Sequence, residues 1–350
     1  MIKILPIDEP GFLQGVIRMI LVGDSEIKLS PSVSYESFSI ELLEQIQPDV
    51  ITIAVEEANI GVAEIIKTIM EFSPLPIILH SESDGNKDGK FLKSLEYGAV
   101  DYFGWPTFKN SIKIGKSHKK FLEKIHYWGA RGLPPFYMQA NNFYPVLKRN
   151  SKYLSQSNKN IKPFDLVVIG ASTGGVGVLS NLLKSIGDIN TPIVIALQVE
   201  NSISQSLVKQ LSEETGKTIV EGETGLVLQN NSITFIPTSV DGVLKKNCTG
   251  QFVFNAIFQP GITVHPSINQ LFISAAQNSK NPVGIILSGH GNDGSKGAMA
   301  LSQKGFLTLV QDPESCLVNE MANSVIESKA KTRLLSIMDI AEYLNSSRRV

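Results

Sequence analysis

The order of apolar and polar residues predicts two α/β regions. In the first region, short apolar runs predict strands at residues 2–7, 49–55, 76–79 and 100–103. Stretches with apolar residues at helical spacing predict helices at residues 11–21, 60–72 and 90–97. Continuous apolar strands that alternate with helices are typical of a parallel sheet covered on both faces.

The alternation starts again at residue 164. Apolar runs predict strands at residues 166–170, 192–197, 284–289 and 306–310, and helices are predicted at residues 178–186, 203–214, 267–278, 296–304 and 322–328. The stretch 232–254 predicts short strands around turns at Asp241-Gly242 and Thr249-Gly250. We therefore expect an α/β fold with two doubly wound parallel-sheet domains.

A polar stretch separates the two regions. Residues 126–163 lose the alternation, contain Pro134-Pro135 and are rich in Ser, Asn and Lys, which is typical of a linker. The basic stretch that precedes them predicts a closing helix with a solvated lysine face, in preference to an RNA or membrane patch. The predicted domains are therefore 1–125 and 164–350, joined by a linker at 126–163.

Composition narrows the classes of protein. The 350 residues are 42% hydrophobic and 19% charged, which excludes a disordered chain. Lys and Arg number 32 against 33 Asp and Glu, so a globally basic nucleic-acid binder is excluded. The two cysteines, Cys248 and Cys316, suit a reducing compartment. No apolar run reaches the ~18 residues of a membrane helix. We expect a cytoplasmic protein without membrane insertion.

The loop after the strand at 166–170 has the spacing of a nucleophile elbow. Residues 170–174 read Gly-Ala-Ser-Thr-Gly and match G-x-S-x-G, in which a sharp turn exposes a serine at the carboxyl edge of the sheet. The helix start beyond it offers backbone N–H groups to an oxyanion. Ser172 is therefore a candidate nucleophile. The alternative is a phosphate-binding loop, although the lysine of a P-loop is absent.

A serine nucleophile needs a base and an orienting acid. The order Ser…Asp…His is met by Asp241 followed by His265 or His290, without a local motif. A second glycine-rich loop at 288–294 again follows a predicted strand. In it, Asp293 is a candidate acid or the N-cap of the next helix. His290 is a candidate base or an ordinary loop histidine.

Five spaced motifs follow one another in the second domain: VVIGASTGG (167–175), PIVIALQ (192–198), HPSINQLF (265–272), IILSGHGNDG (285–294) and QDPESCLV (311–318). In these motifs and in their order the chain resembles one family, the CheB-type protein-glutamate methylesterases of chemotaxis. These proteins combine a response-regulator receiver, a linker and a serine methylesterase domain. The resemblance covers nearly the whole chain.

The resemblance implies roles for residues of the second domain. Ser172 corresponds to the nucleophile, Asp293 to the acid, and the backbone N–H of Thr173 to an oxyanion donor. Where the family has its catalytic histidine this chain has Val199, which cannot take a proton. His290 stands where the family usually has methionine. Loss of a triad member leaves only about 10³–10⁴-fold catalysis over water, so we expect impaired hydrolysis.

In the first domain the resemblance implies a receiver that lacks its central groups. Asp8 and Glu9 match the acidic pair that holds Mg²⁺, and Ser81 matches the hydroxyl position. Ala54 stands at the phospho-accepting aspartate, and Trp105 at the lysine before a proline. We expect no aspartyl phosphate and weak Mg²⁺ binding, so Asp8 and Glu9 are vestigial.

The sequence therefore predicts a methylesterase homologue of a chemosensory pathway. It is expected to act on or bind methylated chemoreceptors or other chemosensory proteins, with impaired catalysis, no phospho-gating and no cofactor or nucleic-acid partner. One alternative is an active serine esterase with a shifted base such as His290. Another is a different hydrolase or amidase that uses Ser172.

Overall fold

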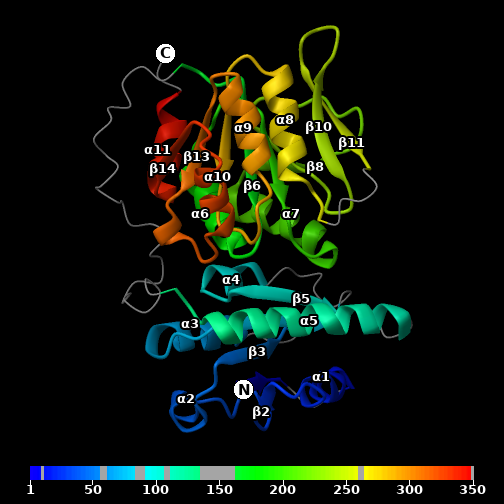
Figure 1. Cartoon of the computed structure of the whole chain (residues 1–350), viewed down its shortest axis with the longest axis vertical. Coiled ribbons are helices and arrows are strands. Elements are labelled where there is room, and N and C mark those ends of the chain that lie inside the picture. Colours follow the sequence, from blue (N-terminus) through cyan, green and yellow to red (C-terminus); the bar gives the residue numbers. More distant parts are fainter. Residues whose placement is uncertain are drawn as a thin grey trace. The chain divides into compact units, whose positions relative to one another are not determined.

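Two compact units make up the chain, Met1–Pro145 and Val146–Val350, each built on its own parallel sheet (Figure 1). The structure, a computed structural model, describes residues 1–8, 12–55, 61–82, 91–105, 111–134, 162–258 and 264–347. Within these ranges no helix combines the length and the hydropathy needed to cross a bilayer.

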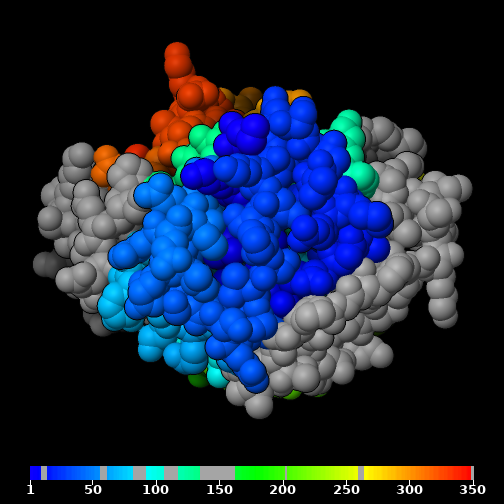
Figure 2. Space-filling view, turned by 90° about the horizontal axis from the view of Figure 1, so that it is seen from below, coloured from blue at the N-terminus to red at the C-terminus, as the bar shows by residue number. Residues whose placement is uncertain are grey.

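The N-terminal unit holds a five-stranded parallel sheet in the order β2-β1-β3-β4-β5. Its strands are β1 (Ile2–Ile7), β2 (Ile27–Leu29), β3 (Val50–Ala54), β4 (Ile77–Glu82) and β5 (Asp101–Trp105). Its helices are α1 (Phe12–Val22), α2 (Ile40–Ile46), α3 (Val62–Phe72), α4 (Phe91–Glu96) and α5 (Ser111–Arg131). The blue part of the chain, with α1, β2 and α2, forms one continuous surface of this unit (Figure 2).

Helix α5 closes the N-terminal unit by packing across β1, β3 and β5. Phe121, Ile125 and Trp128 are spaced four and three residues apart, and all three are fully buried. The helix approaches β1 so closely that a Cβ on Gly129 would lie 2.4 Å from the side chain of Ile2. An apolar stripe at helical spacing therefore fixes this helix on the sheet.

The C-terminal unit holds a seven-stranded parallel sheet in the order β14-β13-β12-β6-β7-β9-β8. Its strands are β6 (Leu166–Ala171), β7 (Ile193–Leu197), β8 (Thr218–Glu221), β9 (Ser232–Phe235), β12 (Pro282–Ile286), β13 (Leu307–Gln311) and β14 (Thr332–Leu335). Its helices are α6 (Gly175–Ser185), α7 (Asn201–Thr215), α8 (Ile268–Asn278), α9 (Ser295–Gln303), α10 (Glu320–Glu327) and α11 (Ile337–Ser346).

Helices cover both faces of the larger sheet. Buried residues of α8, α9 and α10 form one core with the strands, and α6 lies against α7 and α11. The antiparallel hairpin of β10 (Asp241–Lys246) and β11 (Phe252–Ile257) packs on α8. There the backbone N–H of Leu244 donates to Ser274 Oγ at 3.0 Å. The hairpin is thus anchored on α8 through its first strand.

The predicted fold class is confirmed, with corrections in detail. The turn predicted at Asp241-Gly242 is wrong, because these residues pair within β10, whereas Thr249-Gly250 does lie in the hairpin turn. The sequence pattern missed β2, α2, β8, β14 and α11. Helix α5 continues to Arg131, beyond the predicted domain end at residue 125. Most of the predicted linker lies outside the described residues and stays a prediction.

Candidate active site

Three adjacent strands bring the candidate residues to one edge of the larger sheet. Strand β6 lies between β12 and β7, so their carboxyl ends lie side by side. Directly after β6, the backbone N–H of Ser172 donates to Ser288 O at 3.0 Å. The N–H of Gln198, directly after β7, donates to Ala171 O at 2.9 Å. The parallel topology therefore sets Ser172 between the two neighbouring loops.

The turn that carries Ser172 is held tightly. The N–H of Gly175 donates to Ser172 O at 2.8 Å, and Ser288 Oγ donates to Thr173 O at 3.0 Å. Gly174 has φ +73°, and a Cβ there would lie 2.7 Å from Leu317 Cβ. Glycine is therefore required at this position both for its conformation and for space.

Two polar groups of this turn, the Ser172 hydroxyl and the Thr173 N–H, have no hydrogen-bond partner among the described residues. The Ser172 side chain is nearly buried, with 8% of the residue exposed, and Oγ makes no hydrogen bond to any described residue. The N–H of Thr173 has no acceptor among the described residues either, and it lies just before α6. A nucleophile and an N–H donor at a helix N-terminus are therefore close together.

The carboxylate of Asp293 is fully engaged. Oδ1 accepts from the backbone N–H of Asn269 and of Gly294, each at 2.9 Å. Oδ2 accepts from the N–H of Ile268 at 2.8 Å and from Gln198 Nε2 at 2.8 Å. Asp293 therefore accepts hydrogen bonds from the backbone N–H groups at the start of α8. It is not the N-cap of the following helix, α9, because that position is Gly294.

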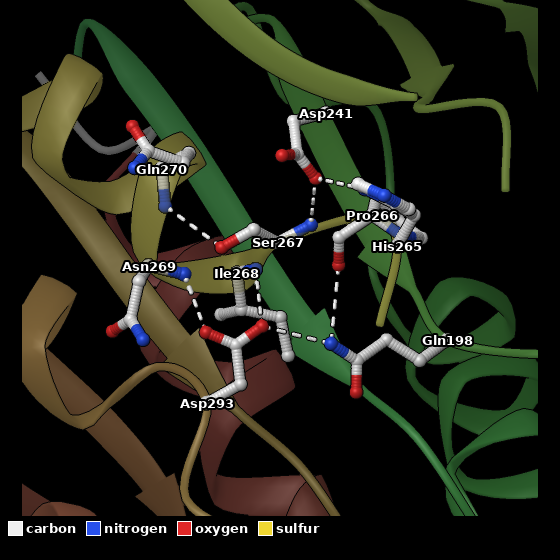
Figure 3. A network of polar contacts seen from close by, with 9 residues as sticks. All are labelled: Gln198, Asp241, His265, Pro266, Ser267, Ile268, Asn269, Gln270 and Asp293. Atoms are coloured by element: carbon white, nitrogen blue, oxygen red, sulfur yellow. Dashed lines mark hydrogen bonds and ion pairs between the residues drawn. The ribbon is translucent and has the colours of Figure 1, made fainter. Parts of the chain in front are cut away.

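Gln198 connects Asp293 with the segment 265–267, which binds a second acidic residue, Asp241. Its Nε2 also donates to Pro266 O at 3.1 Å (Figure 3). Next to Pro266, the Nδ1 atom of His265 lies 2.8 Å from Asp241 Oδ1, which also accepts from the N–H of Ser267 at 2.7 Å. In the sequence, Asp241 followed by His265 was one possible order of acid and base. The structure pairs these two residues, and neither makes a hydrogen bond to Ser172 among the described residues.

His290 is paired with a residue that the sequence did not single out. Its Nδ1 lies 2.6 Å from Glu320 Oε2, and its side chain is 60% exposed. The same carboxylate oxygen accepts from the N–H of Gly291 at 3.0 Å. Among the described residues His290 makes no hydrogen bond to Ser172. Glu320 begins α10, far along the chain, and no local spacing signals its role.

In the N-terminal unit Ala54, the position predicted to match the phospho-acceptor, is buried. Ala54 is 5% exposed, and its carbonyl accepts a hydrogen bond from the Tyr35 hydroxyl at 2.5 Å. The hydroxyls of Ser81 and Tyr102 lie 2.5 Å apart. Asp8 is buried and accepts from Gln14 Nε2 at 2.8 Å, and Glu9 lies outside the described residues.

These residues do not fit Mg²⁺, which needs several oxygen ligands in near-octahedral geometry. Ala54 supplies a methyl group where a carboxylate ligand is required. Nor do the described residues contain a group of three or more Asp, Glu, His or Cys side chains that suits a metal ion.

An aromatic cluster lies on the neighbouring strands, where Ala54 pairs in register with His80 and His80 with Phe103. Trp105 is fully buried, with ring centroids 4.8 Å from Phe103 and 4.9 Å from Phe121. His80 is 1% exposed and meets Phe121 edge-on at 6.1 Å. Burial lowers the pKa of His80 to about 3, because neither ring nitrogen has a hydrogen-bond partner among the described residues. The imidazole is therefore neutral at physiological pH.

Comparison with known proteins agrees with the motifs. A protein-glutamate methylesterase/protein-glutamine glutaminase of Vibrio vulnificus is 25% identical over 344 residues, covering 98% of this chain and 97% of its own. One of Pyrococcus horikoshii is 26% identical, covering 93% and 88%. The crystal structure of the Thermotoga maritima CheB methylesterase catalytic domain is 28% identical, covers 52% of this chain and 97% of its own, and has a TM-score of 0.48.

The family model of the CheB methylesterase matches residues 167–344. This match contains Ser172, Gln198 and Asp293, the residues that the structure brings to one edge of the sheet. Because it takes in just over half of the 350 residues, the chain belongs to the CheB methylesterase family.

Proposed function

We propose that this chain binds glutamyl side chains of methylated chemoreceptors at the Ser172 site and hydrolyses their methyl esters only slowly. One observation carries the proposal. The Ser172 hydroxyl has no partner among the described residues, while Val199 occupies the position of the family's base. A nucleophile without a proton acceptor keeps only binding and oxyanion stabilisation, about 10³–10⁴-fold over water.

Phosphorylation is not part of this proposal. Ala54 offers no oxygen to a phosphoryl group, and Trp105 offers no ammonium to neutralise it. Any control of the site by the N-terminal unit then depends on binding a partner protein.

The test is release of methanol from a methylated receptor fragment, with and without acetyl phosphate. We expect stoichiometric binding of the fragment. We also expect a slow methanol rate that acetyl phosphate does not change and that stays within about tenfold of the Ser172→Ala rate. Turnover that disappears in Ser172→Ala, or that acetyl phosphate raises, contradicts the proposal.

A second candidate function is an active esterase with His290 as the base. It is favoured by the carboxylate of Glu320, which holds Nδ1 of His290 at 2.6 Å as an acid holds the histidine of a triad. The residue before His290 is also close to the nucleophile, since a Cβ on Gly289 would lie 3.0 Å from Ser172 Cβ.

Two variants decide between the candidates. If His290 is the base, His290→Asn abolishes methanol release and Glu320→Gln lowers it, while the control His118→Asn in the N-terminal unit leaves it unchanged. Equal slow rates of methanol release in the wild-type chain and in these three variants support the proposal of impaired hydrolysis.

A further inference from the structure

The peptide group between Ser172 and Thr173 has a fixed orientation. Its carbonyl oxygen, Ser172 O, accepts from the N–H of Gly175 at 2.8 Å. Because a peptide group is planar and trans, its N–H points opposite to its carbonyl. The bond to Gly175 therefore also sets the direction of the Thr173 N–H, which has no acceptor among the described residues.

Ser288 holds the peptide groups on both sides of this one. Its carbonyl accepts from the N–H of Ser172 at 3.0 Å, and its hydroxyl donates to Thr173 O at 3.0 Å. The hydroxyl also accepts from the N–H of Val318 at 3.0 Å, and Val318 O, at 3.2 Å, is its other acceptor. Since Ser288 is fully buried, one residue ties the turn of Ser172 to the segment that precedes α10.

Gln311, the last residue of β13, holds the backbone of Ser288. Its Oε1 accepts from the N–H of Ser288 at 2.9 Å, and its Nε2 donates to Ser315 O at 3.0 Å. A reversed amide would set donor against donor and acceptor against acceptor, so the amide has one orientation. Strand β12 lies between β13 and β6, so this buried side chain supports the Ser172 turn through Ser288.

The turn and Ser288 are in direct contact. A Cβ on Gly174 would lie 2.8 Å from Ser288 Oγ, and one on Gly175 would lie 2.9 Å from Ser288 O. No water molecule fits between groups this close, so the hydrogen bonds that hold the turn come from Ser288 itself.

We propose that Ser288 is a positioning residue of the Ser172 site and that Gln311 holds it in place. When Ser172 Oγ adds to a carbonyl carbon, the Oγ–C bond forms, the π-electron pair moves to the carbonyl oxygen, and the hydroxyl proton passes to water. Ser288 keeps the Thr173 N–H directed at the negative oxygen that results. An uncharged carbonyl depends less on this donor, so Ser288 acts on the tetrahedral state more than on the bound ester.

This inference rests on the proposed function, since it concerns the same site. Its test uses two probes on the full chain. One is the N-acetyl, N′-methylamide derivative of glutamate γ-methyl ester, and the other is its analogue with a boronic acid in place of the ester group. The boronic acid forms an anionic tetrahedral adduct, in which a B–Oγ bond to Ser172 forms and one proton goes to the buffer. Because the adduct is measured at equilibrium, it needs no general base.

Boron NMR gives the affinity of the tetrahedral adduct, and ligand-observed proton NMR gives that of the ester. We expect the wild-type chain to bind both probes and Ser172→Ala to form no adduct. In Ser288→Ala the adduct should be about tenfold weaker, because Thr173 O loses its donor, while the affinity for the ester stays the same. Gln311→Met should show the same split with a smaller loss, because its effect passes through Ser288.

Ser274→Ala is the matched control. Its hydroxyl is also buried, accepts from the N–H of Leu244 at 3.0 Å and donates to Leu271 O at 2.8 Å. The variant therefore removes a similar pair of hydrogen bonds from the same unit without touching the Ser172 turn. Both affinities should stay at the wild-type values.

The outcomes separate the inference from the proposed function. An unchanged adduct in Ser288→Ala, an equal loss for both probes, or the same split in Ser274→Ala overturns the positioning role and leaves the proposed function standing. If Ser288→Ala does not fold, Gln311→Met decides by the same two affinities. A wild-type chain that binds the ester without forming the adduct overturns only the inference, and failure to bind either probe overturns both.

Discussion

The two positions at which the sequence predicts a missing reactive group, Val199 and Ala54, have different surroundings. Next to Val199, Gln198 is held by two acceptors, and Asp293 accepts from four N–H donors. Ala54 is 5% exposed and its carbonyl accepts from Tyr35, and in the same unit Trp105 is fully buried among aromatic rings. The first position lies beside a polar network, and the second lies in an apolar core.

Because of this difference, we expect the two sites to respond differently when a reactive side chain is introduced by substitution. Polar groups that are already ordered by hydrogen bonds can bind a charged or polar ligand, so an introduced polar side chain finds hydrogen-bonding groups in place. Buried aromatic side chains stabilise the fold, but their apolar surroundings cannot solvate a charged phosphoryl group. We therefore expect the C-terminal site to regain chemistry after one substitution, and the N-terminal site to resist it.

The largest expected effect comes from Val199→His. An imidazole at this position supplies the missing general base, which contributes about 10²–10⁴-fold in rate. Because Asp293 already has four donors, the new imidazole must compete with Gln198, so we expect a gain near 10²-fold. Methanol release from a methylated receptor fragment measures it.

Val199→Asn is the matched control, since it adds a polar group that cannot act as a base. Its rate should stay at the wild-type level. A folded Val199→His variant without any gain would show that the base position carried over from the family does not apply to this chain.

The next effect concerns Ala54→Asp in the N-terminal unit. A carboxylate at a position that is only 5% exposed loses its hydration without gaining a cation. We expect a loss of about 3 kcal/mol in the free energy of unfolding and no labelling by acetyl phosphate. Both tryptophans of the chain, Trp105 and Trp128, lie in this unit, so tryptophan fluorescence reports its unfolding.

The double variant Ala54→Asp, Trp105→Lys tests whether a cation in place of Trp105 permits phosphorylation. Lysine restores a cation and opens the aromatic cluster, so labelling by acetyl phosphate should become detectable. Efficient labelling of the single variant instead would mean that the pocket is not closed, and the contrast between the two units would fail.

A smaller effect is expected for Asp293→Ala. The substitution leaves the N–H groups of Ile268 and Asn269 at the start of α8 without an acceptor. We expect a loss of about 2 kcal/mol, because unsatisfied helix N-termini cost roughly 0.5–2 kcal/mol. Thermal unfolding followed by circular dichroism measures it, with the exposed Asp188→Ala as control. A variant as stable as this control would limit Asp293 to a role in ligand binding.

Apolar patterns predicted the sheet of each unit, because buried parallel strands are continuous apolar runs. The strand predicted at 2–7 coincides with β1. Short elements at the sheet edges were missed: β2 has only three residues and β8 is half exposed. Their position depends on pairing with β1 and β9, and a local pattern does not contain that information.

For the site, the spacing of G-x-S-x-G predicted the turn at Ser172, and the family motifs supplied Asp293 and Thr173. The partners of Asp293 were not predictable, since Gln198 and Ile268 lie 95 and 25 residues away in the chain. The same holds for Glu320 beside His290, 30 residues further on. Such pairs arise where loops from separate strands meet at one edge.

Counted per pH unit, the smallest effect that we expect is a pH dependence of the stability of the N-terminal unit. The folded-state pKa of His80 is about 3, below its usual 6.5, because the ring is buried without hydrogen bonds. Between these values the unfolded chain binds a proton that the folded chain does not. The stability that neutral His80 contributes is therefore fully present above pH 6.5, and the unit loses about 1.4 kcal/mol per pH unit as the pH falls towards 3.

His80→Leu tests this assignment, because leucine has a similar size and suits the contact with Phe121. The urea midpoint of unfolding, followed by tryptophan fluorescence, should fall less steeply with decreasing pH, by the equivalent of one proton. At pH 7 the midpoint should stay the same or rise, because two unpaired buried nitrogens are removed. The control His118→Leu, in α5, should keep the wild-type slope. An unchanged slope in His80→Leu would mean that His80 is solvated, and the closed character of this pocket would then rest on Trp105 and Tyr35 alone.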